Sequence, residues 1–200
     1  MFLRSVICFL FLANFAFAEQ LNGSFGLVTL GGFSSTNHKG VGLGQVDSKM
    51  GLTFGIGFDF KVLPNVAIEI DILNTQKNFE LTSSGARESY SLTYLEAPVL
   101  VKWIASKNFH MKTGPYLTGL LIDGTRESAG QANPVKASFK NDYGVTFGTW
   151  FGFQTKKNLQ IGLDLRYDLG LADIQWDNDP STLLYTRTFM ALMSLTFNFK

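Results

Sequence analysis

The sequence predicts an all-β protein, an eight-stranded antiparallel up-and-down transmembrane β-barrel. About eight segments alternate apolar residues with glycine or polar residues, which is typical of strands with one apolar face. Only 16% of the 200 residues are charged, yet no stretch after residue 18 approaches the ~20 continuous apolar residues of a membrane helix. The chain also opens on an export signal. These three observations together predict strands that cross a membrane.

The first 18 residues have the pattern of a secretory signal peptide. Arg4 supplies a positive charge, the run Val6–Phe17 is apolar apart from one asparagine, and the small residues around Ala18 form a cleavage site. The run is too short to span ~30 Å of hydrocarbon, which argues against an anchor helix. Cys8 lacks the small residue that a lipoprotein signal places before its cysteine. We expect cleavage after Ala18 and one barrel domain over 19–200.

The composition of residues 19–200 narrows the possible partners. Loss of Arg4 leaves 16 basic residues against 16 acidic ones, so the mature chain is formally neutral. This balance argues against binding to nucleic acid. Cys8 is the only cysteine, so the mature domain is expected to fold without disulfides.

Segment 49–61 shows the alternation most clearly. Its apolar face holds Met50, Leu52, Phe54, Ile56, Phe58 and Phe60, and the opposite face holds Lys49, Gly51, Thr53, Gly55, Gly57, Asp59 and Lys61. Such a strict period of two predicts a strand. The predicted strands are 22–34, 49–61, 66–80, 88–103, 109–122, 142–154, 159–171 and 184–199.

The predicted connections alternate between short and long. Three are tight turns, at 63–65, 105–108 and 155–158, and four are mostly longer polar loops, at 35–48, 81–87, 123–141 and 172–183. Short periplasmic turns opposite longer external loops are typical of outer-membrane barrels. Because open sheet edges cannot be satisfied in lipid, the first strand must pair with the last.

A soluble, lipocalin-like binding barrel would also alternate, but with its apolar face inward. Two features favour a barrel whose apolar face points outward, towards lipid. The apolar faces carry almost no charge, and aromatic residues gather at the strand ends, as in the aromatic girdles of membrane barrels. We expect one girdle of Phe58, Phe60, Trp103, Phe109, Phe151, Phe153, Phe197 and Phe199, and a second of Phe33, Phe79, Tyr90, Tyr143, Trp176 and Tyr185.

Several charges fall on the face predicted to line the interior. One layer joins the third, fourth and fifth strands, with Asp59 close by. Three more charges follow one another higher up, along the seventh strand. The predicted interior network is Asp59, Glu69, Asp71, Lys102, Lys112, Asp164, Arg166 and Asp168. Buried charges of this kind are tolerated when they are paired, which favours a structural ionic plug. A proton or ion path and a catalytic carboxylate cluster are the alternatives.

The fourth strand is ambiguous. Tyr90, Leu92 and Tyr94 share one face, whereas Val99 and Trp103 share the opposite parity. A β-bulge near 96–98 would reconcile the two halves, and Pro98 is otherwise hard to place inside a strand.

The same strand carries a resemblance. Tyr94-Leu95-Glu96-Ala97-Pro98-Val99-Leu100-Val101-Lys102 is similar to the tyrosine-leucine-glutamate-x-proline segment of the PorT-like outer-membrane β-barrel family. The resemblance implies an outer-membrane barrel. It implies little about activity, because that family is functionally mixed.

Little in the sequence points to catalysis. His38 lies in the first long loop and His110 near a short turn, and neither has the carboxylate spacing of a metal site. The glycines of 40–44 precede no helix pattern, so they do not predict a phosphate cradle. No cofactor, metal or catalytic residue is expected, although a barrel-type envelope enzyme acting on lipid A or peptides remains the alternative function.

The expected function is therefore a small outer-membrane barrel with a structural or surface-interaction role, without an open pore. Expected partners are outer-membrane lipid, the barrel insertion machinery and a surface ligand contacted through loops 35–48 and 123–141. We expect a monomer.

Overall fold

The computed structural model describes residues 24–41, 45–83, 86–128, 130–134, 141–156, 158–172, 174 and 183–199. The predicted signal peptide and its cleavage site lie outside these residues. The described part contains nine strands: β1 (Phe25–Val41), β2 (Gln45–Leu63), β3 (Val66–Ser83), β4 (Ala86–Ser106), β5 (Phe109–Ser128), β6 (Gln131–Pro134), β7 (Tyr143–Lys156), β8 (Leu159–Gly170) and β9 (Leu183–Phe199). Within the described ranges no helix is long and apolar enough to cross a membrane.

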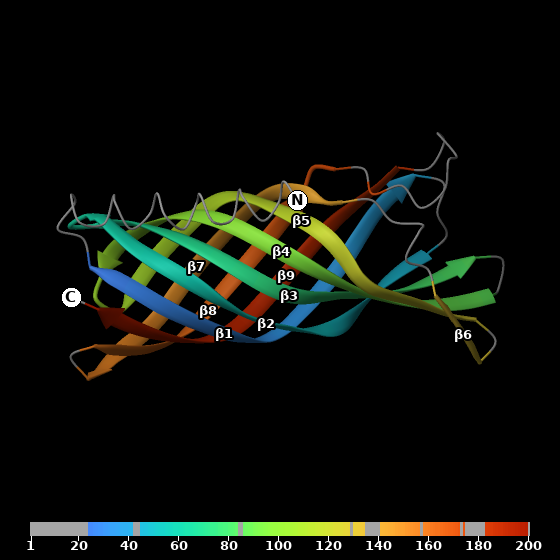
Figure 1. Ribbon diagram of the computed structural model, residues 1–200. Helices are drawn as coiled ribbons and strands as arrows, with labels where there is room; N and C mark the ends of the chain where they lie inside the picture. Colours follow the sequence, from blue (N-terminus) through green and yellow to red (C-terminus); the bar gives the residue numbers. More distant parts are fainter. Residues whose placement is uncertain are drawn as a thin grey trace, which may run out of the picture.

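The strands form one antiparallel sheet in the order β4-β3-β2-β1-β9-β8-β7-β5-β6, and β4 also pairs with β5. That pairing joins the two sides of the sheet into a ring, visible as crossing, tilted ribbons (Figure 1). The first strand pairs with the last over the whole length of β1, from Phe25 to Val41. The predicted antiparallel up-and-down barrel is thus confirmed. The strand absent from the prediction is β6, a short addition that pairs with β5.

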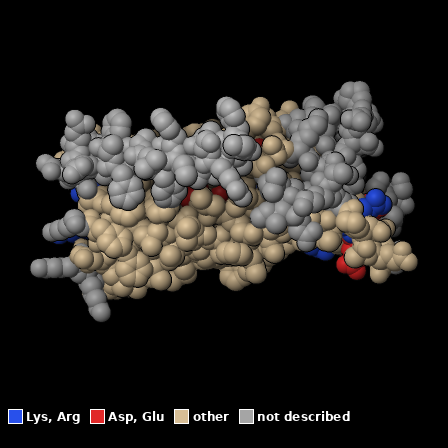
Figure 2. Space-filling view, in the orientation of Figure 1, with Lys and Arg blue, Asp and Glu red and all other residues tan. Residues whose placement is uncertain are grey.

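The alternation predicted from the sequence sorts the side chains between the two faces of the sheet. On β2, Met50 is 67% exposed and Phe54 57%, whereas Thr53 between them is 1% exposed. Figure 2 shows the consequence, because the visible outer wall is mostly free of charged side chains, which gather towards the ends. An apolar exterior around a polar interior is the reverse of a soluble binding barrel.

Several strands extend beyond their predicted ends. Most of the predicted loop 35–48 belongs to β1 and β2, the predicted loop 81–87 is nearly all β3 and β4, and part of 123–141 belongs to β5 and β6. The extensions form the long hairpins at the right of Figure 1. Apart from a few apolar residues such as Val46 and Leu81, which pack inside, these extensions are polar, so no hydrophobic period predicts them as strand.

Ion pairs join these extended hairpins. Lys49 of β2 lies 2.8 Å from Glu80 of β3, and Arg126 of β5 lies 2.5 Å from Glu88 of β4. The Tyr90 hydroxyl donates to Glu88, and this hydrogen bond, together with Arg126, holds the pKa of Glu88 below its usual range. The hairpins thus continue as hydrogen-bonded sheet beyond the apolar wall.

The predicted bulge at 96–98 in the fourth strand is wrong. Residues at even positions of β4 point inward without interruption from Tyr90 to Lys102. The irregularity lies on the neighbouring strand, because Gly119 and Ile122 of β5 are skipped in the pairing with β4. The two extra residues let β5 adjust its register while β4 stays regular from Tyr90 to Lys102.

The structure also corrects part of the predicted second aromatic girdle, because two of its residues point into the barrel. Phe79 and Tyr90 are 2% and 1% exposed, and their rings stack inside the barrel with centroids 4.9 Å apart. Phe33 and Tyr143 do face outward, as predicted. Trp176 lies outside the described residues.

Candidate functional site in the barrel lumen

Arg166 crosses the barrel interior. Its side chain extends from β8. The guanidinium group donates to Asp71 on β3 at 2.6 Å, and to Glu69 on the same strand at 2.9 Å. It also donates to Asp164 of its own strand, at 2.7 Å. The side chain is completely buried. Since β3 and β8 are not neighbours in the sheet, these bonds tie opposite walls together.

Glu69 is the centre of the same network. One of its oxygens accepts from Lys112 of β5 at 2.6 Å, and the other from Lys102 of β4 at 3.4 Å. Lys102 also donates to Asp59 of β2, and Lys112 to Asp164 at 2.7 Å. We call this set the ionic network; its members are Asp59, Glu69, Asp71, Lys102, Lys112, Asp164 and Arg166. It joins five strands by charge-assisted hydrogen bonds, the stronger kind.

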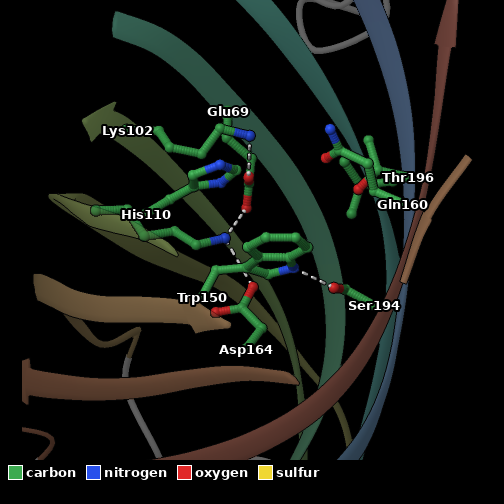
Figure 3. Close-up of a pocket in the computed structure, with 10 residues that line it drawn as sticks. Glu69, Lys102, His110, Trp150, Gln160, Asp164, Ser194 and Thr196 are labelled. Atoms are coloured by element: carbon green, nitrogen blue, oxygen red, sulfur yellow. Dashed lines mark hydrogen bonds and ion pairs between the residues drawn. The ribbon is translucent and has the colours of Figure 1, made fainter. Parts of the chain in front are cut away.

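Beside the ionic network is a small cavity of ≈ 10 Å³. His110 and Trp150 line it with their rings stacked at 4.6 Å, and the Trp150 indole donates to Ser194 at 2.7 Å (Figure 3). Gly162 makes room for the indole, because a Cβ there would collide with the ring. The space suits about one water molecule.

A second polar group lies further along the barrel. Lys77 of β3 is fully buried, 3.1 Å from Asp142 and 3.5 Å from Glu96 of β4. Asp142 also accepts from Tyr116 and Thr186, and Asp168 of β8 accepts from Thr146 at 2.6 Å. We call Lys77, Glu96, Asp142 and Asp168 the acidic cluster, since it holds three carboxyl groups and one ammonium.

The eight predicted interior residues therefore divide between two places. Asp164 and Arg166 join the layer of Glu69 instead of lying above it, because Arg166 reaches across the lumen. Asp168 belongs to the acidic cluster. Sequence analysis did not assign Lys77, Glu96 or Asp142 to the interior. Parity was an available signal for Lys77, which shares the face of Glu69 and Asp71 on one strand.

The sequence predicts no metal site at either histidine. His110 is inside, stacked on Trp150. His38 lies in β1 opposite Thr186 in the register. Across the described ranges no group of three or more His, Cys, Asp or Glu residues could hold a metal ion.

A closed antiparallel sheet with an apolar outer wall and charges inside defines an integral β-barrel of the outer membrane. The sequence profile of the outer membrane protein beta-barrel domain family matches residues 17–175, and the chain belongs to this family. The protein is thus an integral outer-membrane protein. A comparison with curated protein sequences found no match.

Two solved structures are reported for their similarity to this chain, and that of OprG agrees with the fold. The outer membrane protein OprG from Pseudomonas aeruginosa is similar with a TM-score of 0.54 and 9% identity, over 88% of this chain and 96% of OprG. The attachment invasion locus protein Ail of Yersinia pestis is similar with a TM-score of 0.48 and 11% identity, over 87% of this chain and 99% of Ail. At 9% identity, the likeness to OprG shows the fold alone.

Proposed function

We propose that the protein is a closed, non-enzymatic outer-membrane barrel with a structural or surface-interaction role. The observation that carries this proposal is the bridge from Arg166 on β8 to Asp71 and Glu69 on β3. A fully buried guanidinium bonded to the opposite wall occupies the lumen where a pore would run.

The size of the barrel supports the same conclusion. We expect the ring of β1–β5 and β7–β9, with the short β6 outside it, to leave an interior just wide enough for side chains. The cavity beside the ionic network, at ≈ 10 Å³, holds about one water molecule. A lumen bridged by Arg166 beside so small a cavity supports a barrel without an open pore.

Planar bilayer recording tests the proposal. The purified protein should give no steady conductance, while an open porin reconstituted in parallel should give stable steps. Stable channels of porin size formed by this protein would overturn the closed-barrel proposal.

The surface role rests on the extended hairpins. With the short turns periplasmic, as in other barrels, the ends of β3, β4, β5 and the short strand β6 project from the outer face. Residues 35–48 and 123–141 thus remain the proposed contact for a surface ligand. We also propose a monomer, assembled by the barrel insertion machinery and related to the PorT-like barrels through the segment Tyr94–Lys102.

No described feature favours the enzyme alternative. His110 is packed against Trp150 within the lumen, away from the outer rim where a surface enzyme would act. A deletion strain should therefore show an unchanged lipid A profile. A specific loss or gain of one lipid A species, reversed by the wild-type gene, would contradict a non-enzymatic role.

A further inference from the structure

A groove crosses the outer wall of the barrel over strands β4, β5, β7, β8 and β9. Its volume is ≈ 570 Å³, within the range of about 300–1,000 Å³ that is usual for small-molecule sites. The large side chains that line it are 39–52% exposed and point away from the lumen: Trp103, Met111, Phe147, Tyr167 and Phe189. The groove is therefore a feature of the surface that faces lipid.

Two threonines among these large side chains lower the wall. Thr113 of β5 pairs with Phe147 of β7, and Thr149 of β7 pairs with Met111 of β5. Both threonines point outward and belong to the lining of the groove. Each leaves space beside a larger neighbour. The two spaces are adjacent, because threonine and large residue alternate between the two strands.

The surroundings of this wall decide what fills the groove. The protein is integral to the outer membrane, so the hydrocarbon chains of lipid cover its apolar wall. An empty hollow would cost its lining the dispersion contacts that a filled one makes. A flexible acyl chain is thus the occupant that matches both the chemistry and the position of the groove.

Lys107 lies beyond one end of the groove. It is in the turn between β4 and β5, within ~13 Å of Trp103 along the chain. Its side chain is exposed, and no carboxylate among the described residues lies within ion-pair distance of it. Lys49, at the opposite end of the barrel, is instead paired with Glu80. Lys107 is thus an unpaired cation next to an aromatic girdle, at the depth of lipid headgroups.

We propose that the groove and Lys107 form a binding site for one anionic phospholipid of the leaflet on the short-turn side. The acyl chain fills the groove, and the phosphate group contacts the Lys107 ammonium. The remainder of the wall contacts lipid of any kind, whereas this site selects a negatively charged headgroup. The site depends neither on closure of the lumen nor on a ligand of the outer hairpins.

Trp103 provides the reporter, because its indole lines the groove. Bromine atoms on an acyl chain quench the fluorescence of a tryptophan that they contact. The folded protein is placed in phosphatidylcholine bilayers that contain a small fraction of brominated phosphatidylglycerol or, in parallel, brominated phosphatidylcholine. The signal that Trp103→Phe lacks is that of Trp103. Phosphatidylglycerol should bind about fivefold more strongly than phosphatidylcholine, the ratio expected of one lysine near an anionic lipid.

Two variants each remove one half of the site. Lys107→Gln removes the charge and should bring the preference close to one, whereas Lys107→Arg keeps the charge and the preference. Thr149→Leu fills the groove and should lower the preference. The matched controls are Lys49→Gln, at the opposite end of the barrel, and Thr29→Leu, on the outward face of β1 away from the groove. Both should bind the two lipids as wild type does.

Equal binding of the two lipids to wild type would overturn the proposal, as would a preference that survives Lys107→Gln or Thr149→Leu. Quenching by neither lipid would also overturn it, since another occupant, such as a second copy of the chain, would then cover Trp103. If the variants do not fold, competition in wild type decides. Unbrominated phosphatidylglycerol should restore the fluorescence, and equal restoration by phosphatidylcholine contradicts the site. Bilayer conductance plays no part in this test, so the closed-barrel proposal stands or falls separately.

Discussion

Glu69 shows how much can depend on one residue in a sealed lumen. It accepts hydrogen bonds from Lys102, Lys112 and Arg166, which come from three different strands. The pairs are buried, so solvent cannot replace a missing partner. Removal of one cation would leave a carboxylate uncompensated, which is far more costly than loss of a surface ion pair.

Lys102→Met should lower the stability of the protein in detergent by about 3–5 kcal/mol, because Asp59 loses its direct partner and Glu69 one of three. A second change, Asp59→Asn, should recover part of the loss, since it removes the uncompensated charge. The measurement is the unfolding free energy of the single and double variants.

Lys61→Met is the control, because Lys61 is an exposed lysine on β2, two residues beyond Asp59. It should change stability little. Additive effects of Lys102→Met and Asp59→Asn would show that the two side chains do not interact, since contacting pairs normally couple by about 0.5–3 kcal/mol.

Odd and even positions along a strand point to opposite faces, so the sequence predicts for each residue whether its side chain lies inside or outside the barrel. Phe79 shares the parity of Glu69, and Tyr90 that of Lys102, so both belong inside, as the structure shows. The predicted girdle includes Phe79 and Tyr90 because aromatic residues near strand ends are common at membrane interfaces. Glu96 was missed because the predicted bulge at this point left its direction open.

At the scale of elements, β8 is a regular strand whose two faces differ sharply. Asp164, Arg166 and Asp168 are buried, while Leu163 and Tyr167 are exposed on the wall. Leu165 lies between them on the outer face, paired with Ala191 of β9 and Thr149 of β7. The strand therefore places charge inside and apolar surface towards lipid.

Leu165→Arg should impair assembly into the outer membrane, because an arginine near the bilayer centre on a barrel costs about 2–4 kcal/mol. Ser128→Arg, at the end of β5 beyond the apolar wall, is the matched control and should assemble normally. The amount of folded protein in the outer-membrane fraction measures both. Equal amounts of the two variants would mean that Leu165 does not face lipid.

The extended ends of the strands could not be predicted from hydrophobic alternation. Residues 35–41 of β1 and 123–128 of β5 are polar or glycine-rich, and they stay in the sheet by pairing with β9, β4 and β6. Backbone hydrogen bonds hold such segments whatever their side chains are. A pattern based on hydrophobic period therefore ends earlier than the strand does.

At the scale of the whole molecule, each described strand of the ring, apart from the short β6, pairs with a neighbour on either side. β1 pairs with β9 on one side, and β4 with β5 on the other. Lipid cannot satisfy open backbone groups, so the closed state is strongly favoured over partly open ones. The cost of an open sheet edge in lipid predicts this closure. It does not predict which inward residues meet across the lumen, because strand tilt and stagger decide that.

The purified protein in detergent should give a β-rich circular dichroism spectrum and migrate differently on a gel when boiled, because the closed sheet resists detergent until it is heated. A heat-denatured sample and a sample unfolded in urea provide the reference positions. Identical mobility with and without boiling, or a helical spectrum, would contradict the barrel.

The bridge made by Arg166 also has a kinetic meaning. Its partners on β3 lie 95 and 97 residues away along the chain, and the two strands face each other only once the ring is complete. Contacts formed after the transition state affect the unfolding rate and leave the folding rate nearly unchanged. Arg166→Met should thus speed unfolding, measured by dilution into denaturant, while refolding into detergent keeps its rate. By slowing unfolding, the Arg166 side chain would set the lifetime of the inserted barrel.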